Sequence, residues 1–118
     1  MQNMITLNRN KDFNRLYSRG RSYVEQCVVV YVLKNRLKQV RIGITTSKKI
    51  GNAVKRNRAR RLIRESCRKL LPNVRPGVDL VFVARKKTTL VKCDEVLKAI
   101  LKALKEANIW MDSLEQNV

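Results

Sequence analysis

The sequence predicts an α+β fold in which helices pack on a mainly antiparallel sheet. Three segments repeat apolar residues at helical spacing, and three others alternate or are rich in β-branched residues. Their order along the chain is helix, strands, helix, strand, helix, which is typical of a helix-on-sheet sandwich. A chain of 118 residues with 44% hydrophobic residues suits one domain with a modest core. We assign residues 1–110 to that domain and residues 111–118 to a flexible C-terminal tail.

The first helix is predicted from about residue 10 to residue 18. Phe13, Leu16 and Tyr17 recur there on one helical face, and Gly20 can end the helix. The segment 22–34 follows as a strand, because residues 27–33 are rich in β-branched side chains. Period two places two sets on opposite faces of this strand: Cys27, Val29, Tyr31 and Leu33 on one, Val28, Val30 and Val32 on the other.

The next predicted elements are a turn at 35–38 and a strand at 40–46, which we expect to pair with the preceding strand as a hairpin. A long helix is predicted from Asn52 to Leu71, with Asn52 as N-cap and Pro72 ending it. A strand over 78–84 follows, and the strand–helix–strand succession makes at least one parallel pair possible. The final helix starts near Cys93 and carries apolar residues on one face: Val96, Leu97, Ile100, Leu101 and Leu104.

Positive charge is concentrated before the final helix. The net charge is +18, and residues 1–90 hold 23 Lys and Arg against 4 acids, whereas residues 91–118 hold 4 Lys against 5 acids. Such an excess disfavours compaction through self-repulsion and favours a polyanionic partner. We therefore expect the binding surface within residues 1–90 and treat the final helix as scaffold.

The long helix has an apolar face and an arginine face. Projected at 100° per residue, the apolar side holds Ala59, Leu62, Ile63, Ser66 and Leu70, with Cys67 at its edge, and the opposite side holds Asn57, Arg61, Arg64 and Arg68. The helix carries eight cations and one acid, Glu65. A merely solvated charged face normally mixes signs at i,i+4, so this pattern predicts nucleic-acid binding. Lys48, Lys49 and Lys55 cluster at the helix entry, where free N–H groups suit phosphate.

Two interpretations of the aromatic residues remain open. Phe13 and Tyr17 share a helix face and Tyr31 lies on a sheet face, and the ordinary role of each is core packing. If the first helix lies beside that sheet face, the three rings form a stacking platform for unpaired bases.

The sequence offers no catalytic constellation. It contains no His, its nine acids are scattered, and no Gly-rich phosphate loop is present. Cys27, Cys67 and Cys93 are widely spaced and form no C-x-x-C, which favours reduced thiols of a cytoplasmic protein over a disulfide or zinc site. No apolar run approaches 18 residues, and the N-terminus lacks the charged and apolar regions of a signal peptide. We expect no catalytic residue and no bound metal or cofactor in the protein, and no membrane partner.

The stretch 47–65 closely resembles the signature of the bacterial ribonuclease P protein subunit. Its centre is Arg56-Asn57-Arg58, followed by Arg60-Arg61 and Arg64. The resemblance extends to residues 10–20, 28–33 and 81–86, and so to nearly the whole chain. It implies an α-β-β-β-α-β-α order on a four-stranded sheet, with a left-handed βαβ crossover shared with a ribosomal-protein domain. That order splits the segment 22–34 into two strands.

The resemblance also implies partners. In that family an RNA subunit, using magnesium ions, cuts the 5′ leader from precursor tRNA, and the protein binds both that RNA and the leader; no protein partner is required. The residues that would contact the catalytic RNA are Lys48, Lys49, Lys55, Arg56, Asn57, Arg58, Arg60, Arg61 and Arg64, with Arg68 on the same helix face. The residues that would line a leader-binding cleft are Phe13, Tyr17, Tyr31, Arg85 and Lys86.

Two other functions share some of these features. A structural RNA-binding protein of the ribosomal type has the same charge but needs no leader site, so it predicts equal affinity for precursor and mature tRNA. A stand-alone nuclease is disfavoured by the absence of His and the scattered acids.

Overall fold

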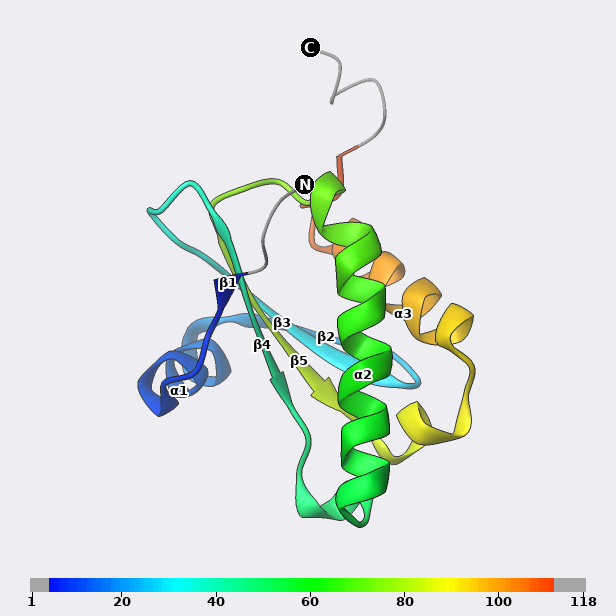
Figure 1. Cartoon of the computed structure of the whole chain (residues 1–118). Coiled ribbons are helices and arrows are strands. Elements are labelled where there is room, and N and C mark those ends of the chain that lie inside the picture. Colours follow the sequence, from blue (N-terminus) through cyan, green and yellow to red (C-terminus); the bar gives the residue numbers. More distant parts are fainter. Residues whose placement is uncertain (1–4, 112–118) are drawn as a thin grey trace.

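The computed structural model describes residues 5–111, which form a five-stranded sheet in the order β1-β4-β5-β3-β2 (Figure 1). The strands are β1 Ile5–Thr6, β2 Arg21–Val24, β3 Val28–Lys34, β4 Val40–Thr45 and β5 Val78–Ala84. The pairs β2–β3 and β3–β5 are antiparallel, and β1–β4 and β4–β5 are parallel. The predicted α+β class is confirmed, with the two-residue β1 added to the four expected strands.

The predicted hairpin between β3 and β4 is wrong, because β5 lies between these two strands. All residues of β5 except Val83 are buried, and a strand covered on both faces takes a central place in a sheet. The linker between β3 and β4 crosses the start of β5 and bonds to it. Asn35 N–H donates to the Gly77 carbonyl at 2.8 Å, and Gly77 N–H donates to the Gln39 carbonyl at 3.0 Å.

The segment predicted as one strand over 22–34 forms two antiparallel strands, as the family resemblance implied. The chain turns at residues 25–27, and Glu25 N–H donates to the Val28 carbonyl at 2.9 Å. The predicted alternation holds within β3, where Val28 and Val30 belong to the larger core and Tyr31 packs on the opposite face. Cys27 precedes the strand and is buried with Val28, so it lies on the other side from the one expected.

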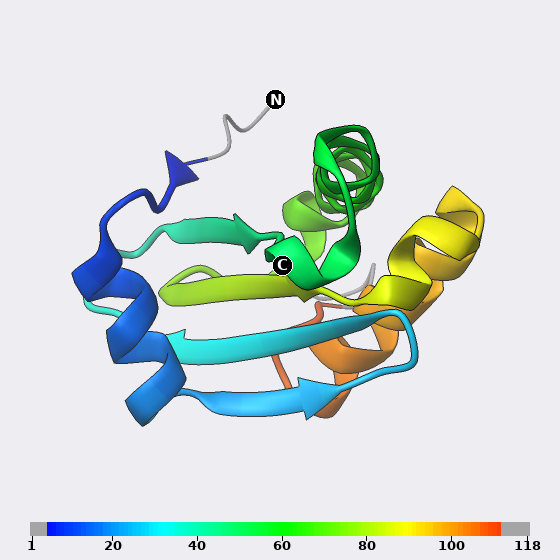
Figure 2. The ribbon, with the colours of Figure 1, turned by 90° about the horizontal axis from the view of Figure 1, so that it is seen from below.

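Three helices cover the two faces of the sheet (Figure 2). Helix α1, Asn10–Arg19, lies on one face, and α2, Ala53–Leu70, and α3, Cys93–Glu106, lie on the other. Helix α2 connects the parallel strands β4 and β5 by a left-handed crossover, which the family resemblance implied and periodicity could not show (Figures 1 and 2). Short 3₁₀ turns follow β4 at Lys48–Ile50, α2 at Leu71–Asn73 and β5 at Lys86–Leu90.

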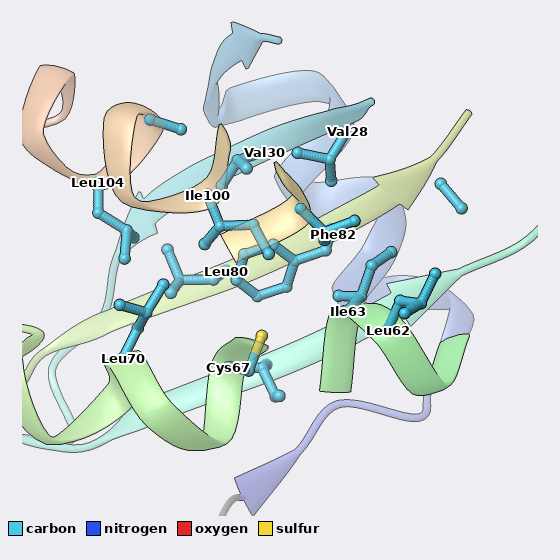
Figure 3. Close-up of a cluster of buried hydrophobic side chains, with 14 of the residues drawn as sticks. Val28, Val30, Leu62, Ile63, Cys67, Leu70, Leu80, Phe82, Ile100 and Leu104 are labelled. Atoms are coloured by element: carbon cyan, nitrogen blue, oxygen red, sulfur yellow. The ribbon is translucent and has the colours of Figure 1, made fainter. Parts of the chain in front are cut away.

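The larger core fills the space between the sheet and helices α2 and α3 (Figure 3). Phe82 of β5 lies at its centre, and Ile63 from α2 and Ile100 from α3 pack toward it; each is at most 1% exposed. Close packing of this kind fixes the rotation of α2 about its axis, since any turn would expose these side chains. The apolar face predicted for α2 is the one that the structure buries: Ala59, Leu62, Ile63, Ser66, Cys67 and Leu70.

A buried carboxylate fastens α1 to the other sheet face. Asp79 of β5 is fully buried and accepts hydrogen bonds from Arg41 Nε at 2.9 Å and Nη2 at 2.7 Å, Arg15 Nη2 at 2.9 Å and Asn35 Nδ2 at 2.7 Å. Burial alone would raise the pKa of Asp79, but the hydrogen bonds from Arg41 and Asn35 and the two guanidinium charges outweigh it and lower that pKa. Leu16, Leu7 and Val81 form the smaller core beside this cluster.

The three cysteines are unpaired, and Cys27 and Cys67 are buried. Burial raises the pKa of the Cys67 thiol to about 12, so this cysteine stays protonated at neutral pH. Within residues 5–111, no helix is both long and apolar enough to cross a membrane. The tail expected at 111–118 lies outside the described residues except for Met111, whose N–H donates to the Asn73 carbonyl at 2.7 Å.

Candidate nucleic-acid interface

The entry to α2 is a tight turn that presents lysines. Ile50 is buried at the end of the 3₁₀ turn, while Lys48 and Lys49 before it are exposed. Gly51 has φ of 139°, a backbone region that residues with a Cβ rarely adopt, so it permits the sharp change of direction. As predicted, Asn52 is the N-cap, and its side chain accepts a hydrogen bond from the Lys55 N–H at 3.0 Å.

The solvent side of α2 is the predicted arginine face. Asn57, Arg61, Arg64 and Arg68 are exposed, on the side opposite the buried residues of the helix. Arg58 and Lys55 are also exposed, and Arg56 is half-buried. Helix α2 lies on one face of the sheet (Figure 1), and because its apolar face is buried there, these exposed cations line its solvent side along about three turns.

Few of these cations form ion pairs within the described residues. Arg68 pairs with Glu65 at 3.2 Å, an exposed contact that contributes little to stability. Arg60 is half-buried and its Nη2 donates to Thr46 Oγ1 at 2.8 Å, so this predicted RNA contact also ties α2 to the end of β4. The remaining basic residues of α2 form no ion pair with any residue of 5–111: Lys55, Arg56, Arg58, Arg61, Arg64 and Lys69. A row of unpaired guanidinium groups suits bidentate contacts to phosphate.

The three predicted aromatic residues lie together where α1 meets the sheet. Tyr17 is 39% exposed, and its ring centroid lies 5.0 Å from that of Tyr31 in an edge-on arrangement. Phe13 lies 6.5 Å from Tyr17 and is partly buried over Gly43, where an added Cβ would come within 2.7 Å of its ring. The rings thus lie together as the platform interpretation requires, with Phe13 packed into the core and Tyr17 partly exposed, and the binding of bases stays a prediction.

An uncovered part of the sheet continues from these rings toward the carboxyl end of β5. Val29 lies two residues before Tyr31 on the same face of β3, and strand register places it beside Val83 of β5, which in turn lies beside Thr45 of β4. Val29, Val83 and Thr45 are all partly exposed. The Tyr17 hydroxyl reaches Thr45 Oγ1 at 3.5 Å. We call the surface formed by Phe13, Tyr17, Tyr31, Val29, Thr45 and Val83 the aromatic strip. Sequence alternation could have found Val29, but the places of Val83 and Thr45 depend on β5 lying between β3 and β4, which the predicted hairpin excluded.

Arg85 and Lys86 lie beyond the end of β5, at the far end of the aromatic strip. Arg85 is four residues past Val81, the partner of Tyr31, which is about 13 Å along a strand. The Arg85 guanidinium donates to the Glu25 carbonyl at 2.8 Å, so this cation is held at the β2–β3 turn. Lys86 begins the following 3₁₀ turn and is exposed. These two residues extend the strip and are not in contact with the rings.

A family model described as Ribonuclease P matches residues 1–108. This chain belongs to the ribonuclease P protein family. Among its relatives, the ribonuclease P protein component of Pelotomaculum thermopropionicum is 45% identical over 109 residues, covering 92% of this chain and 97% of that one. The component from an Exiguobacterium species is 42% identical over 110 residues, covering 93% and 96%.

Solved structures of ribonuclease P proteins have the same fold. The protein from Staphylococcus aureus superposes with a TM-score of 0.81 at 30% identity and covers 92% of this chain and 99% of its own. The protein from Thermotoga maritima gives 0.77 at 30% identity and covers 86% and 96%. The residues that resemble the ribonuclease P signature form the 3₁₀ turn at Lys48–Ile50 and the first turns of α2. Within residues 5–111, no three His, Cys, Asp or Glu side chains are grouped as metal ligands.

Proposed function

We propose that this chain is the protein subunit of a ribonucleoprotein RNase P, an endoribonuclease that removes the 5′ leader from precursor tRNA. The chemistry belongs to an RNA subunit, which α2 binds, while the aromatic strip binds the single-stranded leader. The observation that supports this most strongly is the arginine face of α2, with eight cations and one acid on a helix whose other face is buried. Three free thiols favour a cytoplasmic site of action.

Helix α2 has the features needed to bind a folded RNA through its phosphates. Four of its six arginines are exposed along one helix, so its backbone needs no rearrangement before they contact phosphate. Placing this charge between RNA segments screens their mutual repulsion, so less magnesium is needed to hold them together. The protein then assists the reaction by binding and screening, and magnesium serves the RNA subunit.

The aromatic strip suits an unpaired strand better than a duplex. Tyr17 offers an accessible ring face, and the sheet beside it presents Val29, Thr45 and Val83 without a covering helix. Stacking of bases on aromatic rings tolerates any sequence, as a leader that differs between tRNAs requires. Lys86 adds charge for the backbone at the far end of the strip, and Arg85 holds that end in place.

The two surfaces should separate in mutational tests. Arg61→Ala should weaken binding to the catalytic RNA, because it removes an exposed cation that forms no ion pair within residues 5–111. Tyr31→Ala and Tyr17→Ala should mainly weaken binding of precursor tRNA in the holoenzyme, each by about 1–3 kcal/mol for one lost stack. Binding of mature tRNA should not change, because mature tRNA has no leader.

Matched controls make this division testable. Lys98 is an exposed lysine of α3 on the acidic part of the chain, so Lys98→Ala should leave both affinities unchanged. Equal losses for both RNAs in the Arg61 and Tyr31 variants would contradict the assignment of separate roles. Equal affinity of the wild-type holoenzyme for precursor and mature tRNA would instead favour a structural RNA-binding protein.

A further inference from the structure

A second basic surface lies on the α1 side of the sheet, away from α2. Five cations line a hollow of about 390 Å³ between α1 and the β3–β4 loop: Arg15, Arg19, Lys34, Arg36 and Arg41. The sheet separates this surface, which we call the α1–loop hollow, from the arginine face of α2 (Figure 2). A segment of RNA bound along α2 therefore does not occupy the hollow.

The hollow is also distinct from the aromatic strip. At 100° per residue, Leu16 points from α1 into the sheet, with Phe13 and Tyr17 on one flank of the helix and Arg15 and Arg19 on the other. Leu16 is fully buried, which fixes that rotation. Helix α1 thus stands as a ridge between the aromatic strip and the hollow.

The positive charge of the hollow is only partly offset by nearby acids. Asp79 is fully buried and already bonded to Arg15 and Arg41, and Asp12 is buried and pairs with Arg15 at 3.5 Å. Arg19, Lys34 and Arg36 are exposed and form no ion pair with any residue of 5–111. Three free cations therefore stand around two partly neutralised ones, and the surface carries net positive charge.

The loop that carries Arg36 is held in place. The Asn35 side chain accepts from the Leu37 N–H at 2.9 Å and donates to the Gln39 carbonyl at 3.3 Å and to Asp79 at 2.7 Å. Asn35 N–H is bound to Gly77 of the adjoining turn at 2.8 Å. A cation on a loop fixed at both ends loses less conformational freedom on binding than one on a free loop.

We propose that the α1–loop hollow is a second phosphate-binding surface, which holds an RNA backbone segment in addition to those on α2 and the aromatic strip. Arg19, Lys34 and Arg36 contact the phosphates, and the Asp79 cluster with Arg15 and Arg41 forms the rigid floor. This inference rests on the proposed RNA partnership. These cations would contact backbone phosphates in the same way whether the segment is a remote part of the catalytic RNA or the upstream end of a long leader.

The test replaces all three free cations together, as Arg19→Gln, Lys34→Gln and Arg36→Gln. A control protein carries Lys92→Gln, Lys98→Gln and Lys105→Gln, three exposed lysines around α3 that give the same change of net charge. Affinities are measured for the catalytic RNA, and in the holoenzyme for precursor tRNAs with short and long leaders, over a series of salt concentrations. Thermal melts verify that both proteins are folded.

The variant with all three cations of the hollow replaced should bind one class of RNA at least about tenfold more weakly at ~150 mM salt. The slope of log affinity against log salt concentration for that RNA should become shallower by roughly 2–3. A loss for the catalytic RNA assigns the hollow to that RNA, and a loss confined to long leaders assigns it to the leader. Wild-type affinity and slope for every RNA, or an equal loss in the control protein, would overturn the proposal. Failure of the wild-type protein to bind the catalytic RNA at all would instead contradict the proposed function.

Discussion

Replacing Asp79 with alanine should lower the free energy of unfolding by about 3 kcal/mol or more. Removing one partner of a buried ion pair typically costs about 3–5 kcal/mol, because the opposite charge is left without compensation. Here Arg15 and Arg41 keep some access to water, with side chains 39% and 22% exposed, which places the expected loss toward the lower end. Urea titration of the wild type and the variant, in the same buffer, measures this loss in the free energy of unfolding.

Glu106→Ala provides the control, because this glutamate is exposed at the end of α3 and its removal should change stability by less than about 0.5 kcal/mol. Because Asp79 fastens α1, which carries Phe13 and Tyr17, to the sheet, the Asp79 variant should also lose affinity for precursor tRNA. This loss should be larger than its loss of affinity for the catalytic RNA. An Asp79 variant as stable as the Glu106 variant would show that the buried cluster does not hold α1.

The lowered pKa of Asp79 also predicts how the free energy of unfolding depends on pH. Because the pKa of Asp79 is lower in the folded protein than in the unfolded chain, its contribution is complete above the unfolded value of about 4. That contribution disappears as pH falls through the folded pKa, where the native carboxylate takes up a proton. Urea titrations between neutral pH and about pH 3 should therefore show a smaller acid-induced loss for Asp79→Ala than for the wild type. Parallel curves for the two proteins would contradict this assignment.

Raising the salt concentration from about 50 to 200 mM should weaken binding to the catalytic RNA by roughly 10³–10⁵-fold. This follows from about 6–10 phosphate contacts, each releasing a counterion and contributing about 0.9 to the slope of log affinity against log salt. The basic residues at the α2 entry and on its face are numerous enough to supply them. Filter binding over a salt series, at fixed magnesium concentration, measures the slope.

Paired variants locate the contacts behind that slope. Arg61 and Arg64 are exposed and form no ion pair within residues 5–111, so replacing both with alanine should make the slope shallower by about 2. The Lys98 variant should keep the wild-type slope, because the α3 region carries no excess charge. A nearly flat salt response of the wild type would mean that the basic face is not the contact surface.

Local pattern was sufficient to predict the three α-helices, β4, β5 and the orientation of α2, but it missed β1 and merged β2 and β3 into one strand. Strand β5 and the faces of α2 agree with expectation, because a side chain's face depends only on the period of its own helix or strand. Asn52 was identifiable as N-cap because capping is a local interaction.

Strand order was not predictable in this way. Which strands flank β5 depends on a crossover between segments that are distant in the chain. The aromatic strip was therefore found only in part, since Thr45 and Val83 join Tyr31 through pairing with β5. The role of Asp79 was also missed, because its partners Arg15, Asn35 and Arg41 lie 38 to 64 residues away in the chain.

The most direct test of the proposed function is cleavage of precursor tRNA by the catalytic RNA at low magnesium, with and without this protein. At a magnesium concentration where the RNA alone is nearly inactive, adding the wild-type protein should restore release of the 5′ leader. The protein without RNA should release none, and the Arg61 and Arg64 double variant should require more protein for the same effect. No increase in cleavage on adding the wild-type protein would contradict the assignment of this chain as the protein subunit of RNase P.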